Sequence, residues 1–355
     1  MRKRRLIWFV LGALLLGFVG VSLYFRRPVE YRSDQFLMDT LVSIRVFGTN
    51  EEALRKAVGE AYAEMHRIAD LTDNFPAEGT TANRESDVNR INEMAGVKPV
   101  RVDQDVFTML ELAKSYHDLA DGAFDVTIGP VMRLWGFGGN SPHVPRAADI
   151  MASLVFVDNA RLVLNRKEQT AFLGKSGMAL DLGAIAKGYA TEKALQALKR
   201  NGIKKALIDA GGNIRVLGTN AGGEAWRIGI KNPLKSGDIL AVLSLKDSAA
   251  VTSGDYYRYF ESGGRRYNHI LNPLTGYPAA ENLSVTVVTK DAGLADILST
   301  AFFVLNAEKV LEVVEKLEGV DVFLVTVDRR ILYSPGLKGR IELRAGADFH
   351  NDQSR

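Results

Sequence analysis

The chain has 355 residues, 46% of them apolar and 25% charged, which is typical of a globular protein large enough for one big domain or two lobes. Its net charge is +3, and because much of the basic excess lies in the first 27 residues, the remainder offers no basic surface for nucleic acid. Cysteine is absent, which excludes disulfides, thiolate nucleophiles and zinc–cysteine sites.

The N-terminus predicts a membrane anchor. Residues 6–25 carry no charge, and at about 1.5 Å per residue a helix of this length spans a hydrocarbon core of roughly 30 Å. Four basic residues precede this segment and two follow it. The positive-inside rule therefore makes residues 1–27 a cytoplasmic basic tip and transmembrane signal-anchor of the inner membrane, with the rest of the chain on the extracytoplasmic (periplasmic) side. A cleaved signal peptide is the competing interpretation, because its charged and apolar regions are similar.

The rest of the chain predicts one mixed domain. Residues 28–34 are polar and predict a linker, residues 35–345 predict the folded domain, and residues 346–355 predict a polar tail. Helices and strands alternate without a regular β-α-β rhythm, which favours an α+β fold over a doubly wound sheet. Residues 72–92 are polar and predict a loop. Apolar periodicity predicts helices at 51–71, 103–122, 190–202, 291–301 and 307–319, and strands at 36–48, 205–218, 226–233, 241–247, 249–254, 265–273, 283–290, 320–328 and 330–334.

The predicted helix at 291–301 carries a candidate cation site. Asp291 is placed to cap it, and Asp296 and Thr300, four residues apart, project their oxygens from one helix face. A carboxylate and a hydroxyl are ligands that suit a hard cation such as Mg²⁺. By spacing alone the pair is more often part of a solvated face. The apolar neighbours favour a buried helix, in which a lone carboxylate is costly unless something pairs with it.

A second candidate stretch, "ALDLGAIAKGYATEKAL" at 179–195, interrupts an apolar run with Asp181, Lys187 and two glycines just before a helix. A glycine-rich entry to a helix can present backbone N–H groups to phosphate, and Lys187 adds a positive charge. An exposed carbonyl near Gly183–Ala184 could complete a metal shell. A plain strand-to-helix turn explains the same residues, and neither a Walker A loop nor a dinucleotide fingerprint is present.

Three further stretches combine glycine with polar side chains, at 121–138, 209–218 and 251–260. The first could line a flat aromatic ligand or pack one lobe on another. In the second, two glycines would let the backbone approach a ligand closely. The third offers Thr252, Ser253 and Asp255 as hydrogen-bonding groups or turn caps. "HILNPLTG" at 269–276 gathers scarce residues, and by itself it is an ordinary turn.

Taken in order, "MDTLVSIRVFG", "DGAFDVTIGPVMRLW", "ALDLGAIAKGYA", "DAGGNI", "VTSGDYYRYF", "HILNPLTGYP" and "ADILSTAFFVL" resemble the ApbE family of FAD:protein FMN transferases, from about residue 36 to about residue 335. The resemblance implies an ApbE-like (T-fold-like) domain of two lobes. It also implies a Mg²⁺-dependent transfer of FMN from the substrate FAD to a Thr or Ser hydroxyl of a target flavoprotein through a phosphoester bond, with release of AMP. The target could be a subunit of a membrane redox complex.

Site residues follow from the same resemblance. It implies that the metal is held by Ala184 through its carbonyl, Asp296 and Thr300. It implies that FAD is contacted by Met38, Ala123, Phe124, Asp125, Asp181, Lys187 and Ile270. His269 is then the polar group nearest the transferred phosphate and the candidate proton acceptor, since an imidazole titrates near neutral pH. Asp181 and a metal-bound group are the alternative acceptors.

Two departures from the family pattern stand out. Asn272 occupies a position where the family most often has Asp, so that residue keeps a hydrogen-bonding shape without a charge. Only the end of segment 72–92, "DVNRIN", resembles the usual run. Two other functions fit similar residues: an FAD carrier of the envelope and an FAD pyrophosphatase that makes FMN and AMP. A membrane-tethered scaffold without chemistry is a third alternative, and the intact set of Asp181, Lys187, His269, Asp296 and Thr300 argues against it.

Overall fold

The computed structural model describes residues 29–74, 86–137, 141–344, 346 and 348–351. The predicted anchor at 6–25 lies outside these residues and stays a prediction. Within the described ranges, no helix is both long and apolar enough to cross a membrane.

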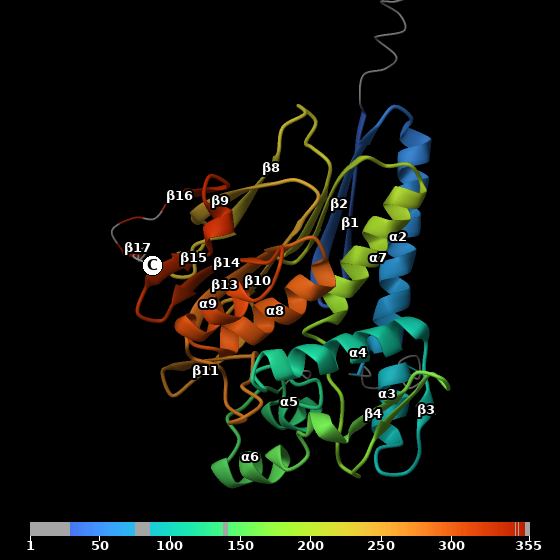
Figure 1. Ribbon diagram of the computed structural model, residues 1–355, viewed down its shortest axis with the longest axis vertical. Helices are drawn as coiled ribbons and strands as arrows, with labels where there is room; N and C mark the ends of the chain where they lie inside the picture. The colour runs from blue at the N-terminus through green and yellow to red at the C-terminus, as the bar shows by residue number, and fades with distance from the viewer. Residues whose placement is uncertain (1–28, 75–85, 138–140, 345, 347, 352–355) are drawn as a thin grey trace, which may run out of the picture.

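A nine-stranded sheet forms the centre of the molecule (Figure 1). Neighbouring strands are antiparallel except for the last pair, which is parallel. In spatial order the strands are β1 (Val29–Leu37), β2 (Thr40–Gly48), β6 (Lys205–Ala210), β7 (Asn213–Leu217), β10 (Ala249–Gly254), β13 (Asn282–Thr289), β14 (Asp321–Thr326), β15 (Arg330–Tyr333) and β17 (His350–Asn351).

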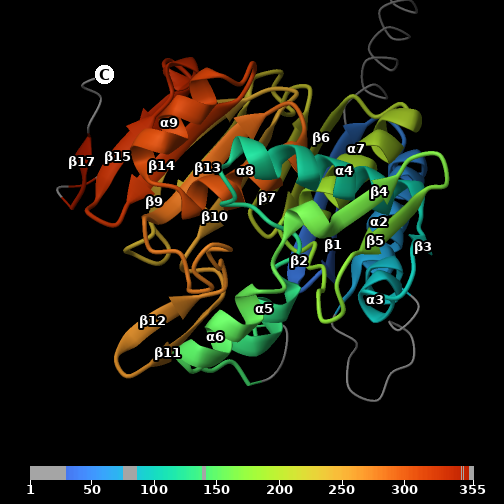
Figure 2. The same cartoon turned by 60° about the horizontal axis from the view of Figure 1, so that its bottom comes forward.

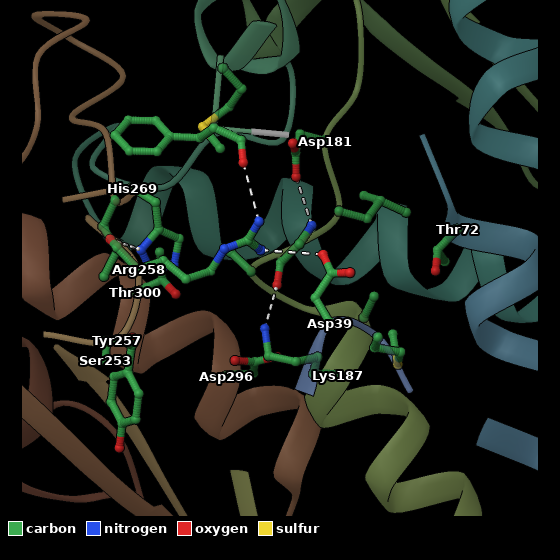
Figure 3. A pocket seen from close by; sticks show the side chains of 18 of the residues that line it. Asp39, Thr72, Asp181, Lys187, Ser253, Tyr257, Arg258, His269, Asp296 and Thr300 are labelled. Atoms are coloured by element: carbon green, nitrogen blue, oxygen red, sulfur yellow. Dashed lines mark hydrogen bonds and ion pairs between the residues drawn. The ribbon is translucent and has the colours of Figure 1, made fainter. Parts of the chain in front are cut away.

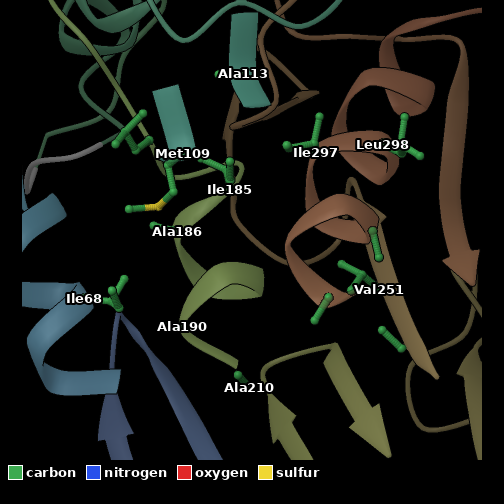
Figure 4. Packing of buried hydrophobic residues seen from close by; sticks show 14 of the residues in the cluster. Ile68, Met109, Ala113, Ile185, Ala186, Ala190, Ala210, Val251, Ile297 and Leu298 are labelled. Atoms are coloured by element: carbon green, nitrogen blue, oxygen red, sulfur yellow. The ribbon is translucent and has the colours of Figure 1, made fainter. Parts of the chain in front are cut away.

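Helices cover one face of this sheet and enclose the largest apolar core. The covering helices are α2 (Glu51–Thr72), α7 (Ala186–Arg200), α8 (Ala292–Val304) and α9 (Ala307–Glu315), and α4 (Gln104–Leu119) packs against α2 and α8. Figure 4 shows α7, with Ala186 and Ala190, between Met109 of α4 and Ile297 of α8. Small side chains on α7 allow neighbouring helices to come close, and this closeness shapes the site described below.

A three-stranded sheet covers the opposite face, with strand order β16 (Ile341–Leu343), β9 (Ile239–Leu245) and β8 (Trp226–Lys231). Its inward side chains and those of the large sheet form a second apolar cluster that includes Trp226, Phe323 and Phe349. A smaller third cluster surrounds Trp135. It joins α5 (Gly129–Trp135) and α6 (Ala147–Leu154) to the hairpin of β11 (Tyr259–Ser262) and β12 (Arg265–Asn268), which lie together in Figure 2.

The remaining elements are short and complete the helical side of the molecule. They are α3 (Asp87–Glu93), η2 (Asn159–Arg161), η3 (Pro335–Leu337) and a small sheet of β3 (Val100–Arg101), β5 (Thr170–Leu173) and β4 (Leu162–Asn165).

The mixed α+β class predicted from the sequence is confirmed, but several boundaries are wrong. The linker predicted at 28–34 lies almost entirely in β1, which pairs with β2 along its whole length. The single strand predicted at 36–48 instead contains the last two residues of β1, the turn at Met38–Asp39 and the whole of β2. The segment predicted as loop 72–92 ends in helix α3, capped by Ser86, although residues 75–85 lie outside the described ranges.

The polar tail predicted at 346–355 is also partly structured. Phe349 is buried in the second apolar cluster, and residues 350–351 pair with β15 as β17. The strand predicted at 265–273 stops at residue 268, because Asn272 and Gly276 form a turn in which the Gly276 N–H donates to the Asn272 carbonyl at 2.8 Å.

Candidate active site

A cavity of about 640 Å³ opens where the helical side meets the ends of β2, β7 and β10 (Figure 3). This volume is in the range of pockets that hold small molecules and cofactors. Segments far apart in sequence converge on it, and they include all the residues that the resemblance singled out: Met38, Ala123, Phe124, Asp125, Asp181, Ala184, Lys187, His269, Ile270, Asp296 and Thr300. The structure thus brings the whole predicted set together, while the role of each residue stays a prediction.

The turn between β1 and β2 places the first of these residues. Met38 and Asp39 have φ of 51° and 58°, in the left-handed region. Two-residue hairpin turns of this kind favour Asn and Gly, because other side chains are strained there by about 1 kcal/mol or more. A strained backbone persists only where the surrounding structure fixes it. In this turn the strained conformation places the side chains of Met38 and Asp39 on the cavity wall.

Helix α8 presents Asp296 and Thr300 to the cavity from one face, as their spacing predicts. The predicted cap is confirmed, since the Asp291 side chain accepts a hydrogen bond from the Leu294 N–H at 2.8 Å. Asp296 is only 5% exposed, and its Oδ2 accepts from the Gly188 N–H at 2.8 Å. Burial raises the pKa of Asp296, whereas the nearby Lys187 charge and the Gly188 N–H act in the opposite direction.

Gly188 explains why α7 can approach α8 so closely. A Cβ atom at this position would lie 2.2 Å from the Ala292 carbonyl oxygen and 2.6 Å from the Cβ of Asp296. Only glycine leaves room for the backbone contact that satisfies the buried carboxylate. The "AKGYA" pattern therefore serves packing between two helices as well as the turn into α7.

Asp181 and Lys187 lie on the segment that leads into α7. The Asp181 Oδ1 accepts from the Gly183 N–H at 2.8 Å, while Oδ2 is buried and has no partner among the described residues. The Lys187 Nζ donates to the Gly183 carbonyl at 3.2 Å. Buried polar atoms are nearly always paired, so the spare Oδ2 in the cavity wall indicates a ligand group that donates to it.

One ring nitrogen of His269 is hydrogen-bonded to the backbone. Its N–H and its Nδ1 lie 3.1 Å and 3.2 Å from the Arg258 carbonyl oxygen, and a carbonyl only accepts, so Nδ1 carries the proton. Nε2 is then the free acceptor of the neutral ring. Burial, followed by the charges of Lys187 and Arg258, holds the pKa of His269 well below its usual range.

The matching family model is described as the ApbE family and covers residues 38–324. The chain belongs to the ApbE family. Among its relatives, the FAD:protein FMN transferase of Klebsiella pneumoniae (strain 342) is 37% identical over 307 residues, covering 86% of this chain and 92% of the relative. The FAD:protein FMN transferase of Treponema pallidum (strain Nichols) is 32% identical over 349 residues, with 94% of each chain covered.

Solved structures give the same assignment to the ApbE family. The ApbE protein of Thermotoga maritima MSB8 superposes with a TM-score of 0.79 at 33% identity, covering 88% of this chain and 99% of that one. The flavin transferase ApbE of Vibrio cholerae gives a TM-score of 0.77 at 26% identity, with the same coverage of each chain.

The donor set around α8 suits a hard cation. In the described part of the chain, no three side chains of His, Asp or Glu converge on a common point. Asp296, Thr300 and Ala184 all line the cavity, and a carboxylate, a hydroxyl and a backbone carbonyl are oxygen ligands of the kind that Mg²⁺ binds. The residues present fit the metal that the ApbE resemblance implies.

Two cavity residues were missed by the sequence analysis. The Arg258 guanidinium lies 3.5 Å from an Asp39 carboxylate oxygen and donates to the Phe137 carbonyl at 3.1 Å, so it spans the cavity in Figure 3. Asn213 is buried beside Asp296, and a hydrogen bond from its side chain is one of the contacts that act to lower the pKa of that carboxylate. Both lie in stretches whose glycines and hydroxyl groups are the stronger local signal, and neither has a spacing that marks it as a cavity residue.

Proposed function

We propose that this chain transfers FMN from FAD to a Thr or Ser hydroxyl of a target flavoprotein, forming a phosphoester bond and releasing AMP with the help of Mg²⁺. The observation that carries the proposal is the single cavity that collects every residue implied by the family pattern. The names of the relatives support it, since each is an FAD:protein FMN transferase.

Different parts of the cavity wall bind different parts of FAD. Met38, Phe124 and Ile270 supply apolar surface for a flat isoalloxazine ring, and the spare Oδ2 of Asp181 accepts from a ligand N–H or O–H. Lys187 and Arg258 supply positive charge for the pyrophosphate, for which a planar guanidinium is well shaped.

Phosphoryl transfer requires alignment and charge neutralisation more than covalent help from the enzyme. The acceptor hydroxyl oxygen forms a bond to the FMN-side phosphorus as the bridging P–O bond to AMP breaks. The hydroxyl proton passes to Nε2 of His269, or to Asp181 in the alternative assignment. Asp296, Thr300 and the Ala184 carbonyl would hold Mg²⁺, which neutralises charge on the leaving phosphate when bound.

The location of the reaction belongs to the same proposal. Residues 6–25 anchor the chain in the inner membrane and residues 28 onward face the periplasm, as the flanking basic residues indicate. A target on that side, such as a subunit of a membrane redox complex, is within reach of the cavity.

Mass spectrometry tests the proposal on a mixture of the full chain in detergent, FAD, Mg²⁺ and a candidate acceptor domain with an exposed Thr or Ser. We expect the acceptor to gain one FMN, with an equal amount of AMP, and EDTA to abolish both. Free FMN and AMP with an unmodified acceptor would instead favour a pyrophosphatase. Bound FAD without AMP would favour a carrier.

A further inference from the structure

A second cavity, of about 370 Å³, lies between the small sheet and the large one. Its walls are mainly apolar, with Lys231, Asp209 and three threonines as polar groups. The lining residues on which the argument depends are Leu41, Thr252, Tyr257 and the β8 residues Ile228 to Lys231.

The two cavities meet around Tyr257. Four residues line both of them: Thr40, Gly211, Thr252 and Tyr257. Thr252 and Ser253 are neighbours in β10, so their side chains point to opposite faces of the large sheet. Thr252 Oγ1 contacts Thr286 Oγ1 at 2.8 Å in the second cavity, whereas Ser253 Oγ lies 3.0 Å from Ser299 Oγ on α8. The cavities therefore meet at the residues they share, at the start of β2, the turn between β6 and β7 and the end of β10, and an acceptor hydroxyl must pass from there to the face covered by α8.

One wall of the second cavity is the backbone of an edge strand. Four consecutive residues of β8, Ile228–Lys231, line it, and β8 is the last strand of the small sheet. Within the described ranges β8 pairs only with β9, so its other edge leaves backbone N–H and C=O groups free. In Figure 1 the side of the small sheet formed by β8 is turned toward β2. A free edge next to a cavity suits an added strand.

The surface between the two cavities is apolar. Phe36 and Leu41 are cross-strand partners in the β1–β2 hairpin and are 75% and 59% exposed. Phe36 lines the first cavity and Leu41 the second. Exposed apolar pairs at the entrance to a cavity are typical of surfaces that bind other proteins.

We propose that the second cavity is the docking groove for the acceptor protein, and this inference rests on the proposed transferase function. An extended segment of the acceptor pairs with the free edge of β8, contacts Leu41, and delivers its Thr or Ser hydroxyl past Tyr257 to the phosphate held beside α8. FAD occupies the first cavity, so the hydroxyl needs an entrance of its own, and the junction of the two cavities supplies it.

The first test is the double variant Leu41→Glu/Lys231→Glu in the full chain, assayed with whichever acceptor domain the unchanged chain flavinylates. We expect the KM for the acceptor to rise about tenfold while kcat and the Kd for FAD stay within about twofold, because both changes lie in the groove and not in the FAD cavity. The matched control is Met151→Glu/Lys246→Glu, two exposed residues that line neither cavity.

The outcomes separate this inference from the function it rests on. If the unchanged chain modifies no acceptor, the transferase proposal itself fails. Three outcomes would overturn the docking groove alone. They are a KM for the acceptor that does not change in the groove variant, a KM that rises equally in the control variant, and a loss of FAD affinity in the groove variant as large as its rise in KM.

Hydrogen exchange tests the strand pairing independently. With FAD and an acceptor whose reactive residue is changed to Ala, the amides of β8 should exchange more slowly, while those of the edge strand β4 should not change. Protection confined to β1, or absent from β8, would overturn pairing at this edge.

Discussion

The two walls of the first cavity, which we propose holds FAD, are built in different ways. On the α7–α8 wall, Gly188 and Asp296 are buried and joined by a backbone hydrogen bond. On the opposite wall, the strained turn at Met38 and Asp39 meets Arg258 through a long ion pair between well-exposed side chains. The α7–α8 wall is held in place by packing and is called the fixed wall. The wall of Met38, Asp39 and Arg258 is held by contacts that a charged ligand can replace, and is called the adaptable wall. Substitutions should therefore cost stability on one wall and mainly affect binding on the other.

Gly188→Ala is expected to have the largest effect. The added methyl group collides with the Ala292 carbonyl, so α7 and α8 must separate, at a cost of about 2–3 kcal/mol of unfolding free energy. Urea unfolding measures this loss, and transfer activity should disappear with it. The control is Gly59→Ala on α2, where a Cβ meets nothing within 4 Å; helix propensity predicts a gain of about 0.5–1 kcal/mol there. A stable, active Gly188→Ala variant would contradict the fixed wall.

Asp296→Asn separates chemistry from packing on the same wall. The amide keeps the shape of the carboxylate but is a weaker cation ligand, so we expect transfer at saturating FAD to fall by about 100-fold or more. Its melting temperature should match or exceed that of the unchanged chain, because a buried charge is removed. Unchanged activity and an unchanged response to Mg²⁺ would remove Asp296 from the metal site.

His269→Ala tests the proton acceptor, and we expect kcat to fall by about 100-fold with little change in the Kd for FAD. The pKa of His269 is lowered in the folded chain, so its ring stays neutral below pH 6.5, where the same residue in an unfolded chain takes up a proton. The acid limb of the kcat/KM profile should accordingly lie below pH 6.5. The His269 contribution to stability should fall as the pH drops from 6.5 toward that lowered pKa. Transfer that is undiminished in His269→Ala would assign the proton to another group, with Asp181→Asn as the next variant.

The sequence predicted the fixed wall better than the adaptable one. Asp296, Thr300 and Lys187 lie in blocks with helical spacing and an ordered set of glycines, so pattern and chemistry coincide. The sequence at 36–48 predicts a single strand, because the turn at Met38–Asp39 has no Asn or Gly to mark it. Residues 28–34 predict a linker, because one edge and much of the surface of β1 are exposed and the strand therefore carries polar residues.

Tertiary contacts explain why the sequence does not predict Arg258 as a cavity residue or β17 as a strand. Arg258 has no local pattern that marks it, and its partners Asp39 and Phe137 are more than a hundred residues away in the chain. The last strand, β17, is two residues long and depends on the burial of Phe349 between sheets that the local sequence does not show. Such contacts form only when distant segments meet, so composition and periodicity do not report them.

The smallest effect is expected from Asp39→Asn, which probes the adaptable wall. Asn tolerates the left-handed turn, and an exposed ion pair contributes little, so the unfolding free energy should change by less than about 0.5 kcal/mol. Removing the carboxylate frees Arg258 for the pyrophosphate, and the Kd for FAD should fall by about twofold to threefold, measured by quenching of flavin fluorescence.

Arg258→Gln supplies the opposing change. It should weaken FAD binding by about tenfold, because a bidentate charged contact is lost. In the double variant the benefit of Asp39→Asn should vanish, since there is no guanidinium left to release. If the two single effects simply add, Asp39 and Arg258 act independently, and the ion pair between them is not what the ligand replaces.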